Sequence, residues 1–545
     1  MAYFTNSKVF LLPSFDLEVK EQDKIDRFLS FLEHSGVGAV IEKEVRNATS
    51  RGGRPNCNYH HLFAAIVYGF AFDRYSLRDI EDACRFDLRY IYIMEQTKVD
   101  HTTVCRFMNK VVVPHEKEIF SCLCNEIRNE LSISFDDAFV DGTKYEANAN
   151  KYKFVWKPTT YHKRISDSAY RIMEENGLMD GLKRESLIRS STIALAITRS
   201  EERECGSDVR KALEHMLEKV LEYEAKEEAC GPLRKSYYKT DRDATAMCLK
   251  ADYYSGLGSN MHAAYNVQVL VVRGFVFAYY VSQSRNDCSD FIPLLGSFYE
   301  NYGEYPKRVC ADSGYGVTKN YRFLRTHGIG NYVKFQSWEG NVTGRSPDCY
   351  RLLDDGKIAC LAGKEGSEVK IESRHPTKAD AVFFRVDGCS GCHFSGYCKR
   401  FIRRQDEDFK IFEVVKEQQL YKQEAAENLL SPKGIEIRVN RSIQVEGIFG
   451  VVKQDYGRWR LRRRGMGKVS AELMLYFLGL NIARLFRFFE TGRLSKYWTA
   501  PDYLEPQSFR KPSAKKLSKK GKKVNQKMIT NMDRKKQEIK KAQQA

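Results

Sequence analysis

Three carboxylates occupy positions where an acid is costly unless it is paired or bound to a metal. Asp141 lies inside or at the end of one apolar segment, Asp312 ends another, and Glu446 lies in a predicted helix with an apolar stripe. If the two segments are neighbouring strands and the helix packs over their ends, the three carboxylates converge. Such a cluster suits Mg²⁺ or Mn²⁺ and two-metal phosphoryl transfer. Taken singly, each acid could instead be a helix cap, a turn residue or an ion-pair partner.

The helix that carries Glu446 has two further features. Lys453 follows Glu446 by seven residues, or two helical turns, and could hold a phosphate beside the metals. Gly447 and Gly450 each cost a helix about 1 kcal/mol relative to alanine. A close approach of the sheet or of DNA would explain them, and a poorly optimised helix is the alternative.

A basic stretch with interleaved aromatic residues follows this helix. Arginine together with aromatic side chains can hold backbone phosphates and stack on exposed bases. A run of charge can also be simply a solvated face, but its position directly after Glu446 favours DNA contact. The predicted contacts are Lys453, Arg458, Trp459, Arg460, Arg462, Arg463 and Arg464.

Clustered cysteines precede the same helix. Cys389 and Cys392 form a C-x-x-C knuckle, with Cys398 after it and Cys360 before it. Four thiols are compatible with a closed tetrahedral zinc site, which would stabilise a small segment with little apolar content. His393 or Cys349 could replace a ligand, and reduced thiols without metal are the alternative.

The elements that must position these residues follow a mixed order. Strands are expected from Phe135 to Asp141 and at 307–312 and 330–335, with a hairpin at 263–281 that turns at Arg273-Gly274. Helices are expected at 290–302, 321–326, 438–453 and 471–488. The resulting order is β, ββ, α, β, α, β, interrupted by a charged helical insert and a cysteine-containing insert.

The first part of the chain has helical periodicity to about residue 130. Ser76 and Asp79 form a predicted N-terminal helix cap, and a second short helix begins near Asp100. Its exposed face would offer Thr103 and Arg106, with Thr102 and Lys110, to DNA. An ordinary helical bundle with a polar outer side is the alternative.

Three of these segments resemble the acidic motifs of bacterial insertion-sequence DDE transposases. They are Val-Asp-Gly-Thr-Lys-Tyr-Glu-Ala-Asn-Ala-Asn from Val140, Val-Cys-Ala-Asp-Ser-Gly-Tyr-Gly from Val309 and Arg-Ser-Ile-Gln-Val-Glu-Gly-Ile-Phe-Gly from Arg441. The similarity extends over most of the chain in order and spacing. It implies an α/β, RNase H-like fold with a mixed sheet and flanking helices, and it implies that Asp141, Asp312 and Glu446 are the catalytic, metal-binding acids.

One departure from that pattern concerns an arginine near the last acid. Relatives often carry Tyr and Arg at the positions of Val439 and Ser442, whereas here Arg441 is displaced by one residue. On a helix this displacement turns the side chain by about 100°, so its role is open.

Charge and composition indicate what kind of molecule the protein binds and where in the cell it is located. The 545 residues carry a net charge of +18, which favours nucleic acid, with an anionic membrane surface as the competitor. The segment 510–545 holds 14 basic and 2 acidic residues, so it reads as a disordered solubilising tail, a phosphate contact or both. No membrane span or signal peptide is expected, and the protein is predicted to be located in the bacterial cytoplasm, at the nucleoid. In that compartment the 15 cysteines would be reduced or bound to metal.

The sequence is therefore interpreted as a transposase that binds the ends of its element, cuts them with metal assistance and joins them to target DNA, as a homo-oligomer. The alternatives are a metal-dependent nuclease of the same fold and an inactive DNA-binding regulator. The expected domains are a helical DNA-binding domain at 1–130, a catalytic domain at 131–500 with inserts at 151–239 and 336–422, and a basic disordered tail at 501–545.

Overall fold

The computed structural model describes residues 22–48, 57–72, 75–232, 234–249, 261–338, 350–371, 381–400 and 406–492. The predicted tail at 501–545 and Cys349 lie outside these residues, so both predictions stay untested. Residues Met1–Trp498 form one compact unit.

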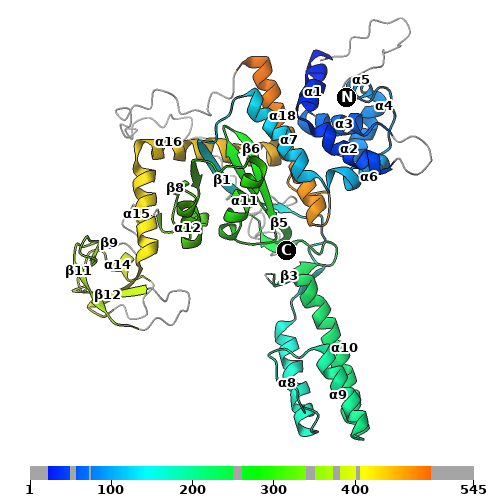
Figure 1. Cartoon of the computed structure of the whole chain (residues 1–545). Helices are drawn as coiled ribbons and strands as arrows, with labels where there is room; N and C mark the ends of the chain where they lie inside the picture. Colours follow the sequence, from blue (N-terminus) through cyan, green and yellow to red (C-terminus); the bar gives the residue numbers. More distant parts are fainter. Residues whose placement is uncertain are drawn as a thin grey trace, which may run out of the picture. The chain divides into compact units, whose positions relative to one another are not determined.

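A mixed sheet carries the two predicted aspartates (Figure 1). Its strands are β1 (Asp137–Glu146), β4 (Thr245–Cys248), β5 (Met261–Val272), β6 (Phe275–Ser282), β7 (Arg308–Ala311) and β8 (Gly330–Val333). The order is β6-β5-β1-β7-β8, and β4 also pairs with β5. The pairs β6/β5 and β5/β1 are antiparallel, while β1/β7 and β7/β8 are parallel. With α11 (Phe291–Tyr302) and α12 (Thr318–Thr326) connecting the last three strands, this is the predicted RNase H-like α/β arrangement.

The hairpin and the first strand show what local pattern could and could not predict. Arg273 and Gly274 both have positive φ, at 49° and 80°, as a tight two-residue hairpin turn requires. Of the two expected places for Asp141, inside the first strand or at its end, the structure has the first, because β1 runs on to Glu146. It continues because β5 supplies backbone partners along this whole length, with Glu146 opposite Ala264.

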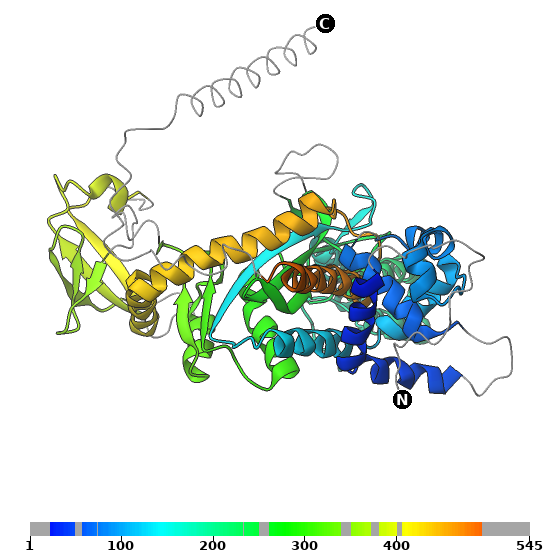
Figure 2. The same ribbon diagram turned by 90° about the horizontal axis from the view of Figure 1, so that it is seen from above.

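The helix expected at 438–453 is present but is not a regular α-helix. It consists of α16 (Pro432–Arg441), the π-helical turn η5 (Ser442–Glu446), α17 (Gly447–Gly450) and the π-helical turn η6 (Val451–Asp455). Figure 2 shows the stretch as one continuous helical ribbon in yellow and orange. A Cβ atom at Gly447 or Gly450 would meet no atom within 4 Å, so a close approach of the sheet does not explain these glycines.

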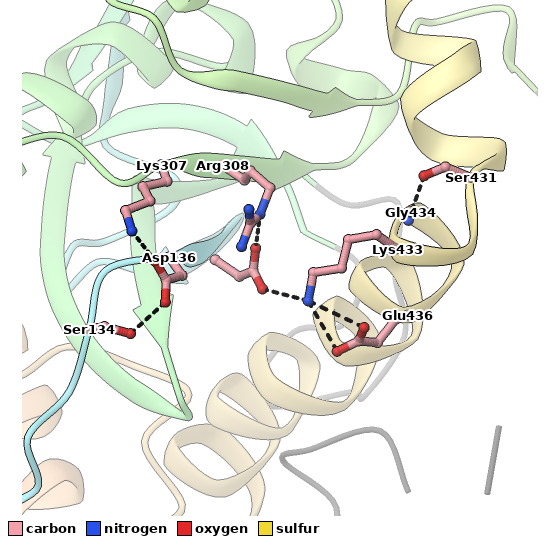
Figure 3. Close-up of polar contacts among 9 residues, drawn as sticks. Ser134, Asp136, Lys307, Arg308, Ser431, Lys433, Gly434 and Glu436 are labelled. Carbon is pink, nitrogen blue, oxygen red and sulfur yellow. Dashed lines mark hydrogen bonds and ion pairs between the residues drawn. The ribbon is translucent and has the colours of Figure 1, made fainter. Parts of the chain in front are cut away.

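Ion pairs fasten the start of this helix to the sheet (Figure 3). Asp137, at the start of β1, lies 2.5 Å from Arg308 of β7 and 3.1 Å from Lys433 of α16. The hydroxyl of Ser431 caps α16 by accepting the Gly434 N–H at 3.0 Å. The carboxylate of Asp137 therefore joins β1, which carries Asp141, to β7, which ends just before Asp312, and to α16, which leads into the turn that carries Glu446.

The N-terminal helices share a hydrophobic core with the sheet. They are α1 (Gln22–His34), α2 (Val37–Ala48), α3 (Tyr59–Phe72), α4 (Leu77–Phe86), α5 (Leu88–Ile93), α6 (His101–Phe107), the π-helical turn η1 (Met108–Val112) and α7 (Glu116–Glu130). The capping pair Ser76 and Asp79 is confirmed at the start of α4. The long helix α18 (Met466–Thr491) packs against α3, α7 and β6. It is long and apolar enough to span a membrane, but 83% of its apolar window is buried inside the protein, as in a core helix.

Both predicted inserts contain structure of their own (Figure 1). The first holds β2 (Phe154–Trp156), α8 (Thr159–Glu175), α9 (Ser190–Glu202), α10 (Ser207–Cys230) and β3 (Ser236–Tyr238). The second holds a five-stranded sheet of β9 (Tyr350–Leu352), β10 (Ile358–Cys360), β11 (Glu365–Val369), β12 (Ala381–Asp387) and β13 (Phe409–Val415), with α14 (Ser395–Cys398) between the last two strands. The helix α15 (Lys416–Leu430) then leads to α16.

A buried acid at the junction of the N-terminal helices and the sheet makes stability pH-dependent. Burial raises the pKa of Glu116 from 4.5 to about 7, although the Ser470 hydroxyl donates a hydrogen bond to it at 2.8 Å. The folded protein therefore holds this proton at pH values where the unfolded chain has lost it. Its contribution to stability is full below about pH 4.5 and is lost as the pH rises to about 7.

Glu116→Gln is expected to flatten this decline and to raise the free energy of unfolding by about 2 kcal/mol at about pH 8. The measurement is the urea midpoint at about pH 5 and about pH 8. Glu118→Gln, on the same helix, is the control, because the Lys43 ammonium lowers the pKa of Glu118. A parental pH profile for Glu116→Gln would contradict the burial argument.

Candidate active site

The two predicted aspartates lie side by side where β7 ends, Asp141 within β1 and Asp312 directly after β7. Val140 of β1 pairs in parallel register with Ala311 of β7, and the next residue of each chain is Asp141 and Asp312. Parallel neighbours deliver successive residues to the same edge of a sheet. The α16–η5 stretch contacts both β1 and β7 and so brings Glu446 to this edge.

Arg441 lies between two of the three acids. Its guanidinium is 3.8 Å from an Asp141 carboxylate oxygen and 3.8 Å from a Glu446 carboxylate oxygen, and the residue is 8% exposed. The π-helical turn η5 explains this, because i to i+5 hydrogen bonding brings residues five apart to about the same face. The displaced arginine therefore faces the acids, and it balances part of their charge.

A pocket with a volume of 460 Å³ collects the predicted residues. Asp141, Asp312, Glu446, Lys453 and Trp459 all line it, although they come from three distant parts of the sequence. The carboxylate set fits a hard divalent cation by its chemistry. Within the described ranges, however, no three ligand-type side chains are gathered closely enough to hold one ion.

Further acids surround this pocket, and their field acts on a buried tyrosine. Burial raises the pKa of Tyr315 well above its usual value, and Asp141, Asp287 and Asp312 add to the effect. Burial also raises the pKa of Asp290 to about 6. The field of these acids at Tyr315 is therefore negative, as expected beside a site for cations.

Sequence reasoning missed Asp287 and Asn266, which also line the pocket. The Asn266 amide donates to Asp287 at 2.8 Å, and the Gln268 amide donates to the same oxygen at 3.0 Å. Both amides are fully buried in the apolar strand β5. The two amides in an otherwise apolar strand could have indicated a nearby polar partner, because buried polar groups need hydrogen-bond partners.

Lys453 reaches the strand that carries Asp141. Its ammonium donates to the Thr143 hydroxyl at 2.6 Å and to the Lys144 carbonyl at 2.8 Å, and it lies 4.4 Å from the centre of the Tyr145 ring. It shares the pocket with Glu446, as its spacing predicted. Its role toward phosphate stays a prediction.

The basic stretch forms a loop, here called the basic loop (residues 456–465), between η6 and α18. Several of its arginines have partners inside the protein. Arg458 stacks 3.7 Å from the Tyr75 ring centre, and Arg460 lies 3.7 Å from Glu146. The Arg464 guanidinium donates to the Asn148 carbonyl at 2.7 Å. Arg462 is exposed and Arg463 is half-buried. Some of the arginines therefore hold the loop in place through contacts inside the protein, and others are on its surface. The sequence alone could not show which arginine belongs to which group.

The predicted DNA-reading helix is α6. The Asp100 carboxylate caps it by accepting the Thr103 N–H at 2.6 Å. Arg106 is exposed and Thr103 is half-buried. The sequence did not reveal that the His101 ring lies 2.6 Å from Glu81 of α4, a contact that fixes α6 against α4. DNA contact by Thr103 and Arg106 stays a prediction.

The four predicted cysteines share one small cavity. Cys360, Cys389, Cys392 and Cys398 all line it. Gly391 takes a positive φ of 68° inside the knuckle. Lys410 is 5% exposed, and its ammonium donates to the Cys398 sulfur at 3.3 Å. Among the residues that the structure describes, no three of these side chains lie close enough together to hold a metal ion. Zinc binding therefore stays a prediction.

Comparison with known families decides the class of protein. Residues 359–486 match the transposase DDE domain, and residues 14–110 match the transposase domain DUF772. The two matches support an insertion-sequence DDE transposase. No curated protein and no solved structure matches the chain.

The two matched ranges cover different parts of the candidate site. The DDE-domain match includes Glu446, the basic loop and the four cysteines, while the DUF772 match includes α4 and α6. Asp141 and Asp312 lie outside both ranges, so their assignment in this transposase depends on the geometry of the sheet. Transposases with this domain generally use divalent metals.

Proposed function

We propose that this transposase binds the ends of an insertion sequence, hydrolyses the DNA there and joins the new 3′-hydroxyl to a target strand. The supporting observation is the single pocket lined by Asp141, Asp312 and Glu446, with the basic loop continuing from its rim. In this proposal the three acids would hold Mg²⁺ or Mn²⁺, which would supply activation of the attacking oxygen and charge stabilisation of the leaving one.

The other residues act on the DNA itself. Lys453 and Trp459 line the pocket and hold the backbone or an unpaired base near the reacting phosphate. Thr103 and Arg106 contact the terminal repeat. Two ends must be brought together, so we propose that the chain acts as a homo-oligomer on DNA in the bacterial cytoplasm.

The experiment incubates the purified chain with labelled DNA taken from either side of its coding frame, a supercoiled plasmid and Mg²⁺ or Mn²⁺. Labelled ends joined to the plasmid are expected. Cut ends without joined products would favour a nuclease, and bound but uncut ends would favour an inactive regulator. Either result would overturn the proposed strand transfer.

We also propose that Cys360, Cys389, Cys392 and Cys398 hold a structural zinc ion. The small cavity that all four cysteines line supports this, because cysteine sulfurs that include a C-x-x-C pair are ligands of closed tetrahedral zinc sites. The apolar core of this insert contains few residues, so a metal would add needed stability.

The zinc proposal predicts about one zinc per chain after purification under reducing conditions. Cys389→Ser/Cys392→Ser is expected to lose most of it, while Cys122→Ser/Cys205→Ser, at cysteines outside the cluster, retains it. The measurement is elemental analysis of the desalted proteins. Equal zinc in both double variants, or none in the parent, would contradict the assignment.

A further inference from the structure

A second groove lies on the other side of the basic loop from the candidate active site. Its volume is 570 Å³, and its lining draws on the start of α4, on α6, on Asn148 after β1 and on the segment leading into α18. We call it the arginine groove. Its basic lining residues are Arg78, His101, Arg462, Arg463, Arg464 and Lys468.

Positive charge in this groove is concentrated and barely offset. Arg78, Arg462 and Lys468 are exposed, and they come from segments almost 400 residues apart in the chain. The acid in the lining is Glu472, which is 4% exposed. Its carboxylate accepts the backbone N–H groups of Arg462 at 3.0 Å and Arg463 at 2.9 Å, so its charge is used to hold the loop.

The loop that presents these cations is fixed by its neighbours. The Asn148 amide donates to the Arg462 carbonyl at 2.7 Å, and the Leu461 N–H donates to the Glu146 carbonyl at 2.8 Å. Asp243 accepts the Met466 N–H at 2.8 Å. The groove is therefore preorganised, which reduces the entropy lost when a ligand binds.

The same loop connects the arginine groove to the candidate active site. Trp459 lines the pocket of the acids, and Arg462 lines the groove. Three residues span at most about 11 Å, so the two cavities are close enough for one extended ligand to reach both. A continuous polyanion fits this arrangement better than a small anion does.

We propose that the arginine groove binds the phosphate backbone of duplex DNA whose reacting end lies in the candidate active site. The inference rests on the proposed function, which it deepens by naming where the flanking duplex is held. Duplex DNA carries one negative charge per about 1.7 Å of its axis, and arginine binds phosphate in bidentate fashion. The N-terminal helices and the basic loop thus form one composite site.

The test uses the full chain, a fluorescent duplex of about 30 base pairs with arbitrary sequence and fluorescence anisotropy over a series of KCl concentrations. Arg462→Ala/Lys468→Ala is expected to lower the slope of log affinity against log salt by about 1.8 and to weaken binding about 10-fold or more. Arg78→Ala, on the N-terminal wall, is expected to lower the slope by about 0.9. Any contribution of the C-terminal tail is the same in all variants.

Lys163→Ala/Arg171→Ala is the matched control, because both side chains are exposed on α8. It should keep the parental slope, and so should the charge-preserving Arg462→Lys/Lys468→Arg, which separates lost charge from altered folding. Parental slopes for both alanine variants of the groove would overturn the proposal. So would an equal loss in the α8 control, or a loss confined to binding of anionic lipid vesicles.

The outcome is separable from that of the proposed function. DNA binding that depends on the arginine groove, without cleavage or joining, would keep this inference and remove strand transfer. If the parent protein cleaved and joined DNA while the groove variants bound DNA as the parent does, strand transfer would be kept and this inference would be removed.

Discussion

Asp141→Asn is expected to reduce DNA cleavage by about 1,000-fold or more, with little loss of DNA binding. Asparagine keeps the shape of the side chain but removes the charge that would hold a divalent cation, an interaction worth several kcal/mol in the transition state. Asp312→Asn and Glu446→Gln should have effects of the same order. The measurement is the rate of cleavage of labelled element ends in Mg²⁺ and in Mn²⁺, with binding followed separately.

Asp136→Asn is the matched control for these variants. Asp136 lies five residues before Asp141, just ahead of β1, and it pairs with Lys307 at 2.9 Å on the surface. An exposed ion pair contributes little to stability, so cleavage should remain near the parental rate. If Asp141→Asn or Glu446→Gln cut DNA at the parental rate, the assignment of this pocket as the active site would be wrong.

Gly479→Ala is expected to lower the free energy of unfolding by about 3 kcal/mol. A Cβ atom at Gly479 of α18 would lie 2.2 Å from the Phe70 carbonyl oxygen and 2.6 Å from its carbon. These atoms belong to the backbone of α3, so they cannot move aside as a side-chain end could. The two helices would have to separate, which would open the core shared by the N-terminal helices and the sheet.

Gly296→Ala provides the control for this prediction. Gly296 lies in α11, where an added Cβ would meet no atom within 4 Å. There the substitution should stabilise the helix by about 1 kcal/mol. Urea midpoints of the full chain measure both effects. An unchanged midpoint for Gly479→Ala would show that α3 and α18 are not in this close contact.

Much of the fold was predictable because its signals are local. The hairpin follows from two apolar runs around Arg273-Gly274, and the α4 cap follows from the spacing of Ser76 and Asp79. The π-helical turns were not predictable, because hydrogen bonding shifted from i+4 to i+5 leaves little trace in apolar periodicity. The full length of β1 was not predictable, because it is set by partners on β5, more than 100 residues away.

Residue types alone pointed to side chains that line one pocket, but not to the contacts that each of them makes. Lone acids in apolar segments and a run of arginines are unusual enough to be noticed in one sequence. Which arginine is presented and which is used internally depends on Tyr75, Glu146 and Asn148, none of which adjoins the basic loop in sequence. The position of Arg441 likewise depends on the turn η5.

The sequence by itself determined the chemical inventory of this protein: three isolated carboxylates, a cysteine cluster, a basic loop and the order of the strands and helices. Only the tertiary structure decided that β1 and β7 are parallel neighbours, that Arg441 lies between two acids and that the basic loop borders two cavities. The physical reason is the distance along the chain between the groups that interact. Helix caps and turns are fixed by contacts within a few residues, whereas strand pairing and charge neutralisation are fixed by whichever distant groups the common core brings together.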